Sequence, residues 1–533
     1  MKTTNNTKKI DLTKYSRTEL EEQLIKLSTQ VEELYKRIEW YEEQFRLGRE
    51  KKFGPSSEKT DFNQLSFFNE VEAEAVPFYV EPKIEEVIEN FPKKKKKGHK
   101  AKIIKDLPVE VIEYKLDPDT SCPACSEHLH EMSKEIRKEL KVIPAQVIVT
   151  EHVRYVYSCR NCQKNDTTTP VITAPMPVPV IKNSLASPSL IAYIMARKYV
   201  EAVPLYRQEQ QIHHDGIQLS RQTMANWMIK SAEAWLRYLY DRMHEHLVNK
   251  EVLHADETVL EVLCEPGRPA TTDSYMWMYR TSGDSVPIVL YDYREGRSGK
   301  YAKEFLEGFK GYLHTDGYAG YHKVPDITLV GCWAHARRKY DEAIASLPKN
   351  SDGMAAQASK EGLMYCNNLF DLERKMDEEG LTYDQRKQRR LQESKPILEA
   401  YFSWVETQSQ LALPQGYLGQ AITYSRNQKD KLMNFLLDGR LELSNNRGER
   451  AIKPFVIGRK NWLFSNTPRG ATSSAIIYSI IETAKENGLI PFNYLTYLLE
   501  KLPNINLADL EQLDKLLPYS SEIPAHCKSK KKK

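Results

Sequence analysis

The run Val252-Leu-His-Ala-Asp-Glu-Thr-Val-Leu-Glu-Val262 decides the fold of this chain, because it has a strand pattern with two adjacent acids at its centre. Aliphatic and β-branched residues dominate it, as is typical of a strand. Two further β-like runs follow, at Ser274–Arg280 and Val286–Tyr293. An amphipathic helix is predicted at Lys300–Phe309 and another strand at Tyr312–Asp316. The predicted order is βββαβ.

This order matches the first half of a ribonuclease H-like sheet, in which the first and fourth strands are neighbours. Asp256 in the first strand and Asp316 at the end of the fourth are then expected to lie side by side. His254 and His314 each stand two residues before their Asp, so period-two alternation places each on the same face as its carboxylate. They either support that site or simply pack near the strand ends.

A third acid belongs to Asn445-Asn-Arg-Gly-Glu-Arg450, which opens a helical stretch. On a helix, Asn445, Glu449 and Lys453 fall four residues apart on one face, which would place an amide and an ammonium group beside the carboxylate to hold phosphate. Glu442 is a rival to Glu449. Three hard oxygen ligands bind Mg²⁺ or Mn²⁺, and two such ions can activate a water or a 3′-hydroxyl for attack on a phosphodiester. The predicted catalytic metal ligands are Asp256, Asp316 and Glu449.

Basic residues are clustered, although 77 Lys and Arg against 73 Asp and Glu give a net charge of only +4. Lys93–Lys97 is one block that suits a polyanion, and the lysines that end the chain are interpreted as a solvated tail. Trp462 and Phe464 stand among basic residues, a mixture suited to a DNA backbone and an unpaired base. The predicted DNA-binding residues are Arg221, Gln222, Arg337, Arg338, Arg450, Lys453, Arg459 and Lys460.

The spacing of Cys332 and His335 could bind a metal ion, but no other soft ligand stands nearby in the sequence. It is therefore interpreted as helix packing, with Arg337 and Arg338 in contact with phosphate. After this helix, long charged helical patterns at Ala356–Glu378 and Gln385–Gln408 predict a helical insertion that separates the sheet from the third acid.

Ahead of the sheet, Leu185–Val248 is helical in pattern and contains a possible helix-turn-helix. Gly216 would supply the turn and Ser220 would cap a helix that begins at Arg221 and could reach base edges. The alternative is an ordinary pair of packed helices.

Four cysteines form two Cys-x-x-Cys pairs separated by a predicted hairpin, with a β-like run at Val142–Tyr157 between them. The sequence has neither a secretion signal nor an apolar run long enough to span a membrane, so this spacing favours a metal over a disulfide. A redox dithiol, the alternative, would need only one pair. The predicted ligands of one structural Zn²⁺ in a zinc ribbon are Cys122, Cys125, Cys159 and Cys162.

Apolar residues near the N-terminus alternate in steps of four and three, which predicts a coiled coil. They are Leu20, Leu24, Leu27, Val31, Leu34, Ile38, Tyr41 and Phe45. The intervening residues are mostly polar, which favours a homodimer over packing on the protein's own body.

A chain of 533 residues is too long for one core, and the fold class predicted is multidomain α+β. The predicted domains are a tail and heptad helix at 1–60, a charged linker at 61–105, the zinc ribbon at 106–175, a helical segment at 180–250, the first part of the ribonuclease H-like core at 251–340, the helical insertion at 341–430, the last part of the core at 431–490, and a helical region with a basic tail at 491–533. Residues 505–533 give no functional signal.

Taken together, these motifs resemble the insertion-sequence 66 family of DDE transposases. The resemblance rests on Phe53-Gly-Pro-Ser-Ser-Glu-Lys59, the four-cysteine module, Lys198-Tyr-Val-Glu-Ala-Val-Pro-Leu-Tyr-Arg-Gln208, Leu219-Ser-Arg-Gln-Thr223, His254-Ala-Asp-Glu-Thr258, Asp316-Gly-Tyr-Ala-Gly-Tyr321, Asn445–Arg450 and Arg459-Lys-Asn-Trp-Leu-Phe464. It implies cutting and rejoining of the element's DNA ends by the three acids with two divalent ions. It also implies accessory proteins of the same element and a cytoplasmic, nucleoid-associated bacterial protein.

Two other functions fit the same motifs. One is a catalytically inactive DNA-binding and dimerisation protein, and the other is a structure-selective nuclease that cuts without joining ends.

Overall fold

A computed structural model describes residues 147–158, 171–348 and 353–529, together with separate residues between Glu21 and Ile38. The chain divides into two compact units, one of Met1–Ser57 with Met176–Lys533 and one of Glu58–Pro175. The four predicted zinc ligands, the charged linker and the lysine block at Lys93–Lys97 lie outside the described residues.

The predicted coiled coil lies mostly outside the described residues as well. Three of its heptad residues, Val31, Leu34 and Ile38, are described as helical, and each is about half exposed. The helix is thus confirmed at these positions, whereas self-association through the stripe stays a prediction.

In the smaller unit, β1 (Val156–Ser158) pairs antiparallel with β2 (Val171–Thr173). The prediction of a strand throughout Val142–Tyr157 is wrong for residues 147–155, which have no assigned regular structure. Apolar side chains there are open to solvent, with Val149 90% exposed. β-Branched residues favour a strand only where a partner strand and a face to pack on are present.

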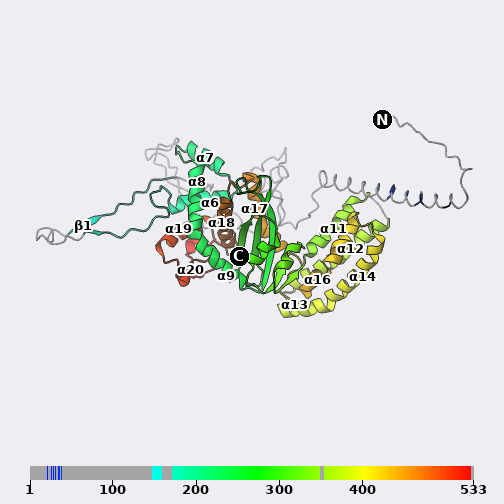
Figure 1. Ribbon diagram of the computed structural model, residues 1–533. Coiled ribbons are helices and arrows are strands. Elements are labelled where there is room, and N and C mark those ends of the chain that lie inside the picture. The colour runs from blue at the N-terminus through cyan, green and yellow to red at the C-terminus, as the bar shows by residue number, and fades with distance from the viewer. Residues whose placement is uncertain are drawn as a thin grey trace, which may run out of the picture. The chain divides into compact units, whose positions relative to one another are not determined.

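The larger unit is built on a five-stranded sheet with the order β5-β4-β3-β6-β7 (Figure 1). Its strands are β3 (Val252–Glu261), β4 (Asp273–Thr281), β5 (Val289–Arg294), β6 (Gly311–His314) and β7 (Ile327–Val330). β4 runs antiparallel to both β3 and β5, and β6 and β7 run parallel to β3. The predicted order βββαβ and the pairing of the first and fourth strands are confirmed.

Helices cover the sheet. α10 (Gly299–Phe305) connects β5 to β6, and the short 3-10 helix η3 (Ala319–Lys323) follows β6. On the face that carries Asp256 lies α17 (Asn446–Trp462), which packs against β3 and β4.

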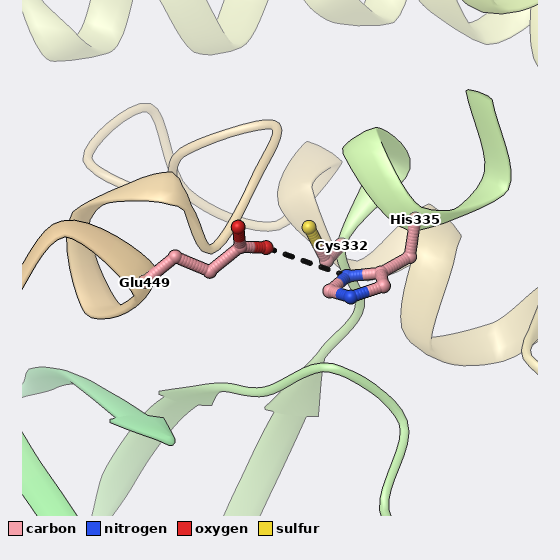
Figure 2. A group of neighbouring side chains, drawn as sticks. All are labelled: Cys332, His335 and Glu449. Atoms are coloured by element: carbon pink, nitrogen blue, oxygen red, sulfur yellow. Dashed lines mark ion pairs between the residues drawn. The ribbon is translucent and has the colours of Figure 1, made fainter. Parts of the chain in front are cut away.

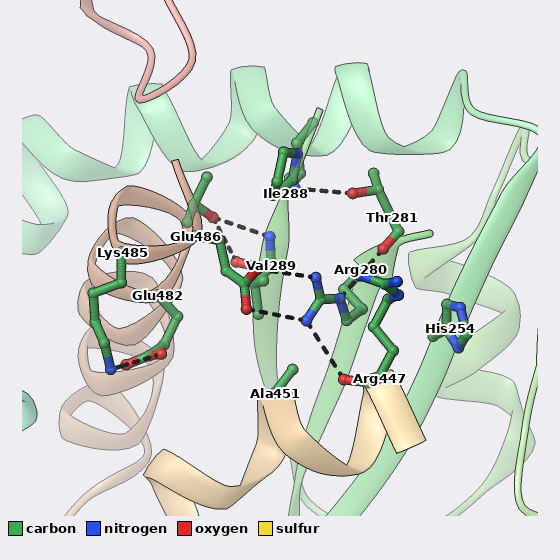
Figure 3. A network of polar contacts seen from close by, with 12 residues as sticks. His254, Arg280, Thr281, Ile288, Val289, Arg447, Ala451, Glu482, Lys485 and Glu486 are labelled. Atoms are coloured by element: carbon green, nitrogen blue, oxygen red, sulfur yellow. Dashed lines mark hydrogen bonds and ion pairs between the residues drawn. The ribbon is translucent and has the colours of Figure 1, made fainter. Parts of the chain in front are cut away.

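The long helix α18 (Pro468–Glu486) runs along β5, the outermost strand (Figure 3). Ser479 and Thr483, one turn apart, accept hydrogen bonds from the backbone N–H groups of Tyr291 and Val289 at 2.8 and 3.0 Å. An unpaired strand edge is prone to pairing with other chains, so these hydroxyls satisfy and cover it.

The predicted helical segment before the sheet consists of α6 (Pro188–Tyr199), α7 (Leu205–His214), α8 (Arg221–Ser231), the π-helical turn η2 (Ala232–Leu236) and α9 (Arg237–Val248). The turn between α7 and α8 has the predicted glycine and the predicted serine cap. Gly216 takes a left-handed φ of 82°, and the Ser220 hydroxyl accepts from the Thr223 N–H at 3.2 Å. The two helices and the turn lie where they were predicted, and the helix-turn-helix with its reading of DNA stays a prediction.

The helical insertion comprises α11 (Trp333–Ser346), α12 (Met354–Glu378), α13 (Tyr383–Arg389), the π-helical turn η4 (Arg390–Ser394), α14 (Lys395–Leu411), α15 (Tyr417–Asn427), α16 (Lys429–Met433) and η5 (Asn434–Leu436). It forms its own core, in which Trp333, Tyr340 and Tyr401 are fully buried. Figure 1 shows these helices gathered on one side of the sheet, and α16 contacts β7. An insertion with its own core explains how Glu449 returns to the sheet so late in the sequence.

The C-terminal region also packs, although residues 505–533 give no signal in the sequence. α19 (Pro491–Lys501), η6 (Leu502–Asn504), α20 (Leu510–Leu516) and η7 (Ala525–Cys527) follow α18. Leu513, Leu516, Ile523 and Cys527 are buried in the same core as the sheet. Within the described ranges, every helix is too short or too polar to cross a membrane.

Candidate active site

Two of the predicted acids meet where β3 and β6 run side by side. The parallel register aligns His254 with His314, and two residues further along each chain stand Asp256 and Asp316. Asp316 stands two residues after the end of β6, and its Oδ1 accepts the N–H of Tyr318 at 3.0 Å, where the chain turns away from the sheet. Both carboxylates therefore follow shortly after the paired residues of β3 and β6.

The third predicted acid lies within electrostatic reach of this pair. Burial raises the pKa of Asp256 well above its usual range, and the negative charges of Glu257, Asp316 and Glu449 add to the increase. The rival acid has another environment, because Glu442 accepts from Nε of Arg447 at 2.5 Å. The Asp256 carboxylate thus feels the negative charges of Asp316 and Glu449, which is an environment that a bound cation relieves.

Glu257 lies next to Asp256 but faces the opposite side of β3. Its buried carboxylate accepts from Nη2 of Arg297 and from the Tyr321 hydroxyl, both at 2.6 Å. Burial raises the pKa of Glu257, while these two donors act in the opposite direction. Adjacent strand residues point to opposite faces, so Glu257 ties β3 to the α10 side of the sheet.

Beneath the carboxylates, His254 and His314 stack with ring centroids 4.4 Å apart. Both are completely buried, which lowers the pKa of His254 to about 3 and that of His314 well below its usual range. The rings are therefore neutral. Of the two interpretations of these histidines, the structure confirms that they pack against each other, directly below the candidate site.

His254 also holds the start of α17. Asn445 stands at the N-cap position of this helix, and its side chain does not cap the helix but donates from Nδ2 to the Ala255 carbonyl at 2.9 Å. Its Oδ1 is then the acceptor for Nδ1–H of His254, also at 2.9 Å. The prediction that the Asn445 amide holds phosphate is wrong, because Asn445 is buried and its amide is occupied by β3. Its role is to fix the helix turn that carries Glu449.

We expect Asn445→Ala to destabilise the protein by about 1–3 kcal/mol, because Nδ1–H of His254 is left buried without a partner. Metal-dependent activity should fall as well, since the helix turn that carries Glu449 loses its hydrogen bond to β3. Urea unfolding and DNA cleavage measure the two effects. Asn446→Ala, at an exposed residue of the same turn, is the matched control. Equal stability of both variants would contradict this role.

Cys332, His335 and Glu449 form a second group beside the acids (Figure 2). Their ligand atoms all lie within 4.8 Å of one another, and Nδ1 of His335 is 3.7 Å from Oε1 of Glu449. Burial raises the pKa of Cys332 to about 11 and lowers that of His335. The interpretation of Cys332 and His335 as packing residues rested on the lack of another soft ligand nearby, and the approach of the Glu449 carboxylate is what sequence spacing could not reveal.

The predicted DNA-binding residues are not all placed alike. Arg338 lies 3.6 Å from Oε2 of Glu449, at the candidate site. Arg337 instead donates to Asn367 at 2.7 Å and stacks over Phe370, so it joins α11 to α12. The prediction of a phosphate contact is thus supported in position for Arg338 and not for Arg337.

The remaining predicted contacts lie on two helices. Arg450, Lys453 and Lys460 are exposed on α17, and Arg459 is half-buried with Nη1 3.2 Å from the Thr258 hydroxyl. Arg221 and Gln222 are exposed at the start of α8, well separated in sequence from the acids. After α17, Leu463 has a φ of 68° and Phe464 is 42% exposed.

A mixed sheet that brings half-buried carboxylates together beyond the paired residues of β3 and β6, with basic residues nearby, suits metal-dependent chemistry on an anionic substrate. Comparison with known families identifies its class. The family described as "Transposase IS66 family" matches residues 183–473, and "zinc-finger binding domain of transposase IS66" matches 119–163. "IS66 C-terminal element" matches 479–519 and "Transposase C of IS166 homeodomain" matches 40–112.

Three proteins of Sinorhizobium fredii (strain NBRC 101917 / NGR234) are similar over most of their length. "Uncharacterized protein y4qI" is 31% identical over 412 residues, 74% of this chain and 73% of the relative. "Uncharacterized protein y4jD" is 29% identical over 76% of this chain and 79% of the relative, and "Uncharacterized protein y4hP" is 28% identical over 76% and 74%. The protein is a transposase by its domains. It belongs to the IS66 family of transposases.

Proposed function

We propose that this protein is a DDE transposase that binds the ends of an insertion sequence and catalyses phosphodiester cleavage and strand transfer. The observation that carries the proposal is the convergence of charge on Asp256, whose buried carboxylate feels both Asp316 and Glu449. The strand order, with β3 between an antiparallel β4 and a parallel β6, supports a ribonuclease H-like core.

Asp256, Asp316 and Glu449 would hold the divalent ions, Mg²⁺ or Mn²⁺. Their fit rests on the donor set, which is all carboxylate oxygen, and on the burial and neighbouring negative charges that raise the pKa of Asp256. Two such ions, when bound, activate the attacking water or 3′-hydroxyl and stabilise the leaving oxygen. The protein's own contribution is to hold two carboxylates on adjacent strands and the third on a helix tied to β3 by Asn445.

The basic residues would hold the DNA backbone near these acids. Arg338 stands at Glu449, and Arg450, Lys453 and Lys460 are exposed on the helix that carries it. Such contacts release counterions, so binding should weaken steeply as salt is raised. The α7–α8 pair and the zinc-finger domain would add contacts to the element ends.

The heptad helix would join two copies of the chain, so that both DNA ends are held together. The family assignment suggests work at the bacterial nucleoid with accessory proteins of the same element. We propose these partners on that basis.

The experiment that tests the function uses DNA that carries the element's own ends, with and without Mg²⁺. We expect Mg²⁺-dependent nicking followed by joining to a target duplex, resolved as distinct products on a denaturing gel. Cleavage without joining would favour a structure-selective nuclease. Binding without cleavage, with the accessory proteins present, would favour a catalytically inactive DNA-binding protein.

A further inference from the structure

Two helix starts face each other beside the candidate active site. Cys332 immediately precedes α11, and His335 lies in the first turn of that helix. Glu449 lies in the first turn of α17. Figure 2 shows the three side chains pointing toward a common point between these helices.

Two of their polar atoms are left without a partner. Nδ1 of His335 and Oε1 of Glu449 are buried, and neither has a hydrogen-bond partner among the described residues. Their separation of 3.7 Å is too long for a hydrogen bond. Two donor atoms that share one tetrahedral ion, each about 2.1 Å from it, lie about 3.4 Å apart. The spacing therefore suits an ion between the two atoms better than a direct bond.

The sulfur atom completes a donor set. Sγ of Cys332 lies within 4.8 Å of the other two ligand atoms. It also accepts the backbone N–H of Asn445 at 3.1 Å, a contact that stabilises a thiolate once a metal has displaced the thiol proton.

We propose that Cys332, His335 and Glu449 bind one transition-metal ion of the Zn²⁺ type. A sulfur, a nitrogen and an oxygen ligand favour Zn²⁺ over Mg²⁺, which prefers oxygen ligands alone. Three protein ligands leave the fourth position of a tetrahedral ion open to water. This ion is separate from the one predicted in the zinc ribbon, and it shares Glu449 with the hard ions proposed for the three acids.

The site would fix the orientation of Glu449. Oε1 of that carboxylate faces His335, and Oε2 faces Arg338 at 3.6 Å. A carboxylate held on both sides cannot rotate freely, so the transition-metal ion would act as a positioning element for the third acid. Metal content is measured without DNA, so failure of this proposal and failure of the proposed catalysis are distinguishable.

The test is the zinc content of the purified full-length chain, measured by mass spectrometry after dialysis against metal-free buffer. We expect Cys332→Ser and His335→Gln each to carry about one Zn²⁺ fewer per chain than wild type. Cys366→Ser is the matched control, because Cys366 is a fully buried thiol of the same helical region that is not part of the group. It should keep the wild-type content.

Substitution with Co²⁺ gives a second measurement, since a cobalt–thiolate bond absorbs in the near ultraviolet. Wild type and Cys366→Ser should show a component that Cys332→Ser lacks. Should Cys332→Ser fail to fold, His335→Gln decides, because His335 is partly exposed and its exchange leaves the thiol in place. Unchanged zinc content in a folded His335→Gln protein would overturn the proposal.

Discussion

Asp256→Asn is expected to reduce Mg²⁺-dependent cleavage and joining by about a thousandfold or more, because it removes a charged metal ligand without changing the side chain's shape. DNA binding should persist, since the basic residues and the helix-turn-helix are untouched. Asp326→Asn is the matched control, at an exposed residue with a φ of 57° that Asn also tolerates. Cleavage by Asp256→Asn at the wild-type rate would contradict the proposed role.

The same substitution should stabilise the protein when divalent ions are absent. Burial and neighbouring acids raise the pKa of Asp256 above its ordinary 3.8. The folded state therefore keeps a proton that the unfolded chain loses, so stability falls as pH rises from about 3.8 towards the raised pKa. An amide carries no such charge, and the melting temperature of Asp256→Asn at neutral pH should exceed that of wild type by on the order of 2 °C. Added Mg²⁺ should raise the melting temperature of the wild type and leave that of Asp256→Asn unchanged.

The sheet was predictable because its determinants are local. Val252–Val262 carries its own strand pattern, and β3 begins at the predicted residue and ends one residue early. The neighbouring position of β6 follows from the short connection through one helix, which returns the chain parallel to β3. Asp256 and Asp316 could therefore be paired from sequence.

The surroundings of the third acid were not predictable in this way. Asn445 bonds to Ala255, 190 residues earlier in the chain, and no local pattern encodes that contact. Helical spacing placed the Asn445 amide beside Glu449, whereas in the structure this amide donates to β3. The meeting of Cys332 and His335 with Glu449 likewise depends on how the insertion folds back, although the Cys-x-x-His spacing was visible.

The packing of the C-terminal residues could not be predicted from sequence for a different reason. Leu513, Leu516 and Ile523 are buried against the main core, but the segments that carry them are short. A helix of one or two turns gives too few periods for its apolar face to be recognised, and its burial comes from tertiary packing.

Arg390→Ala should have the largest effect on stability, because this side chain is fully buried in the helical insertion. Nε and Nη2 donate to the two oxygens of Glu373, both at 2.7 Å. The other hydrogen bonds run to the backbone carbonyls of Phe435, Asp438 and Leu441, at 2.9, 3.0 and 2.8 Å. One guanidinium therefore holds α12 to the segment that leads back to α17.

Removing Arg390 leaves a carboxylate and three carbonyls buried without this donor, and we expect a loss of about 3–5 kcal/mol. Arg386 reaches only one oxygen of Glu373, at 3.1 Å, and compensates in part. Arg374→Ala is the matched control, since Arg374 is 65% exposed and pairs with exposed Asp371. It should cost less than about 0.5 kcal/mol.

Urea unfolding of both variants measures the difference. Because the insertion has its own core, Arg390→Ala should unfold in two separated transitions, with the insertion first. Cleavage should fall in parallel even below the first transition, since a loosened segment at 435–441 no longer fixes the start of α17 and hence Glu449. A single transition at the wild-type midpoint would mean that the guanidinium network does not couple the insertion to the candidate active site.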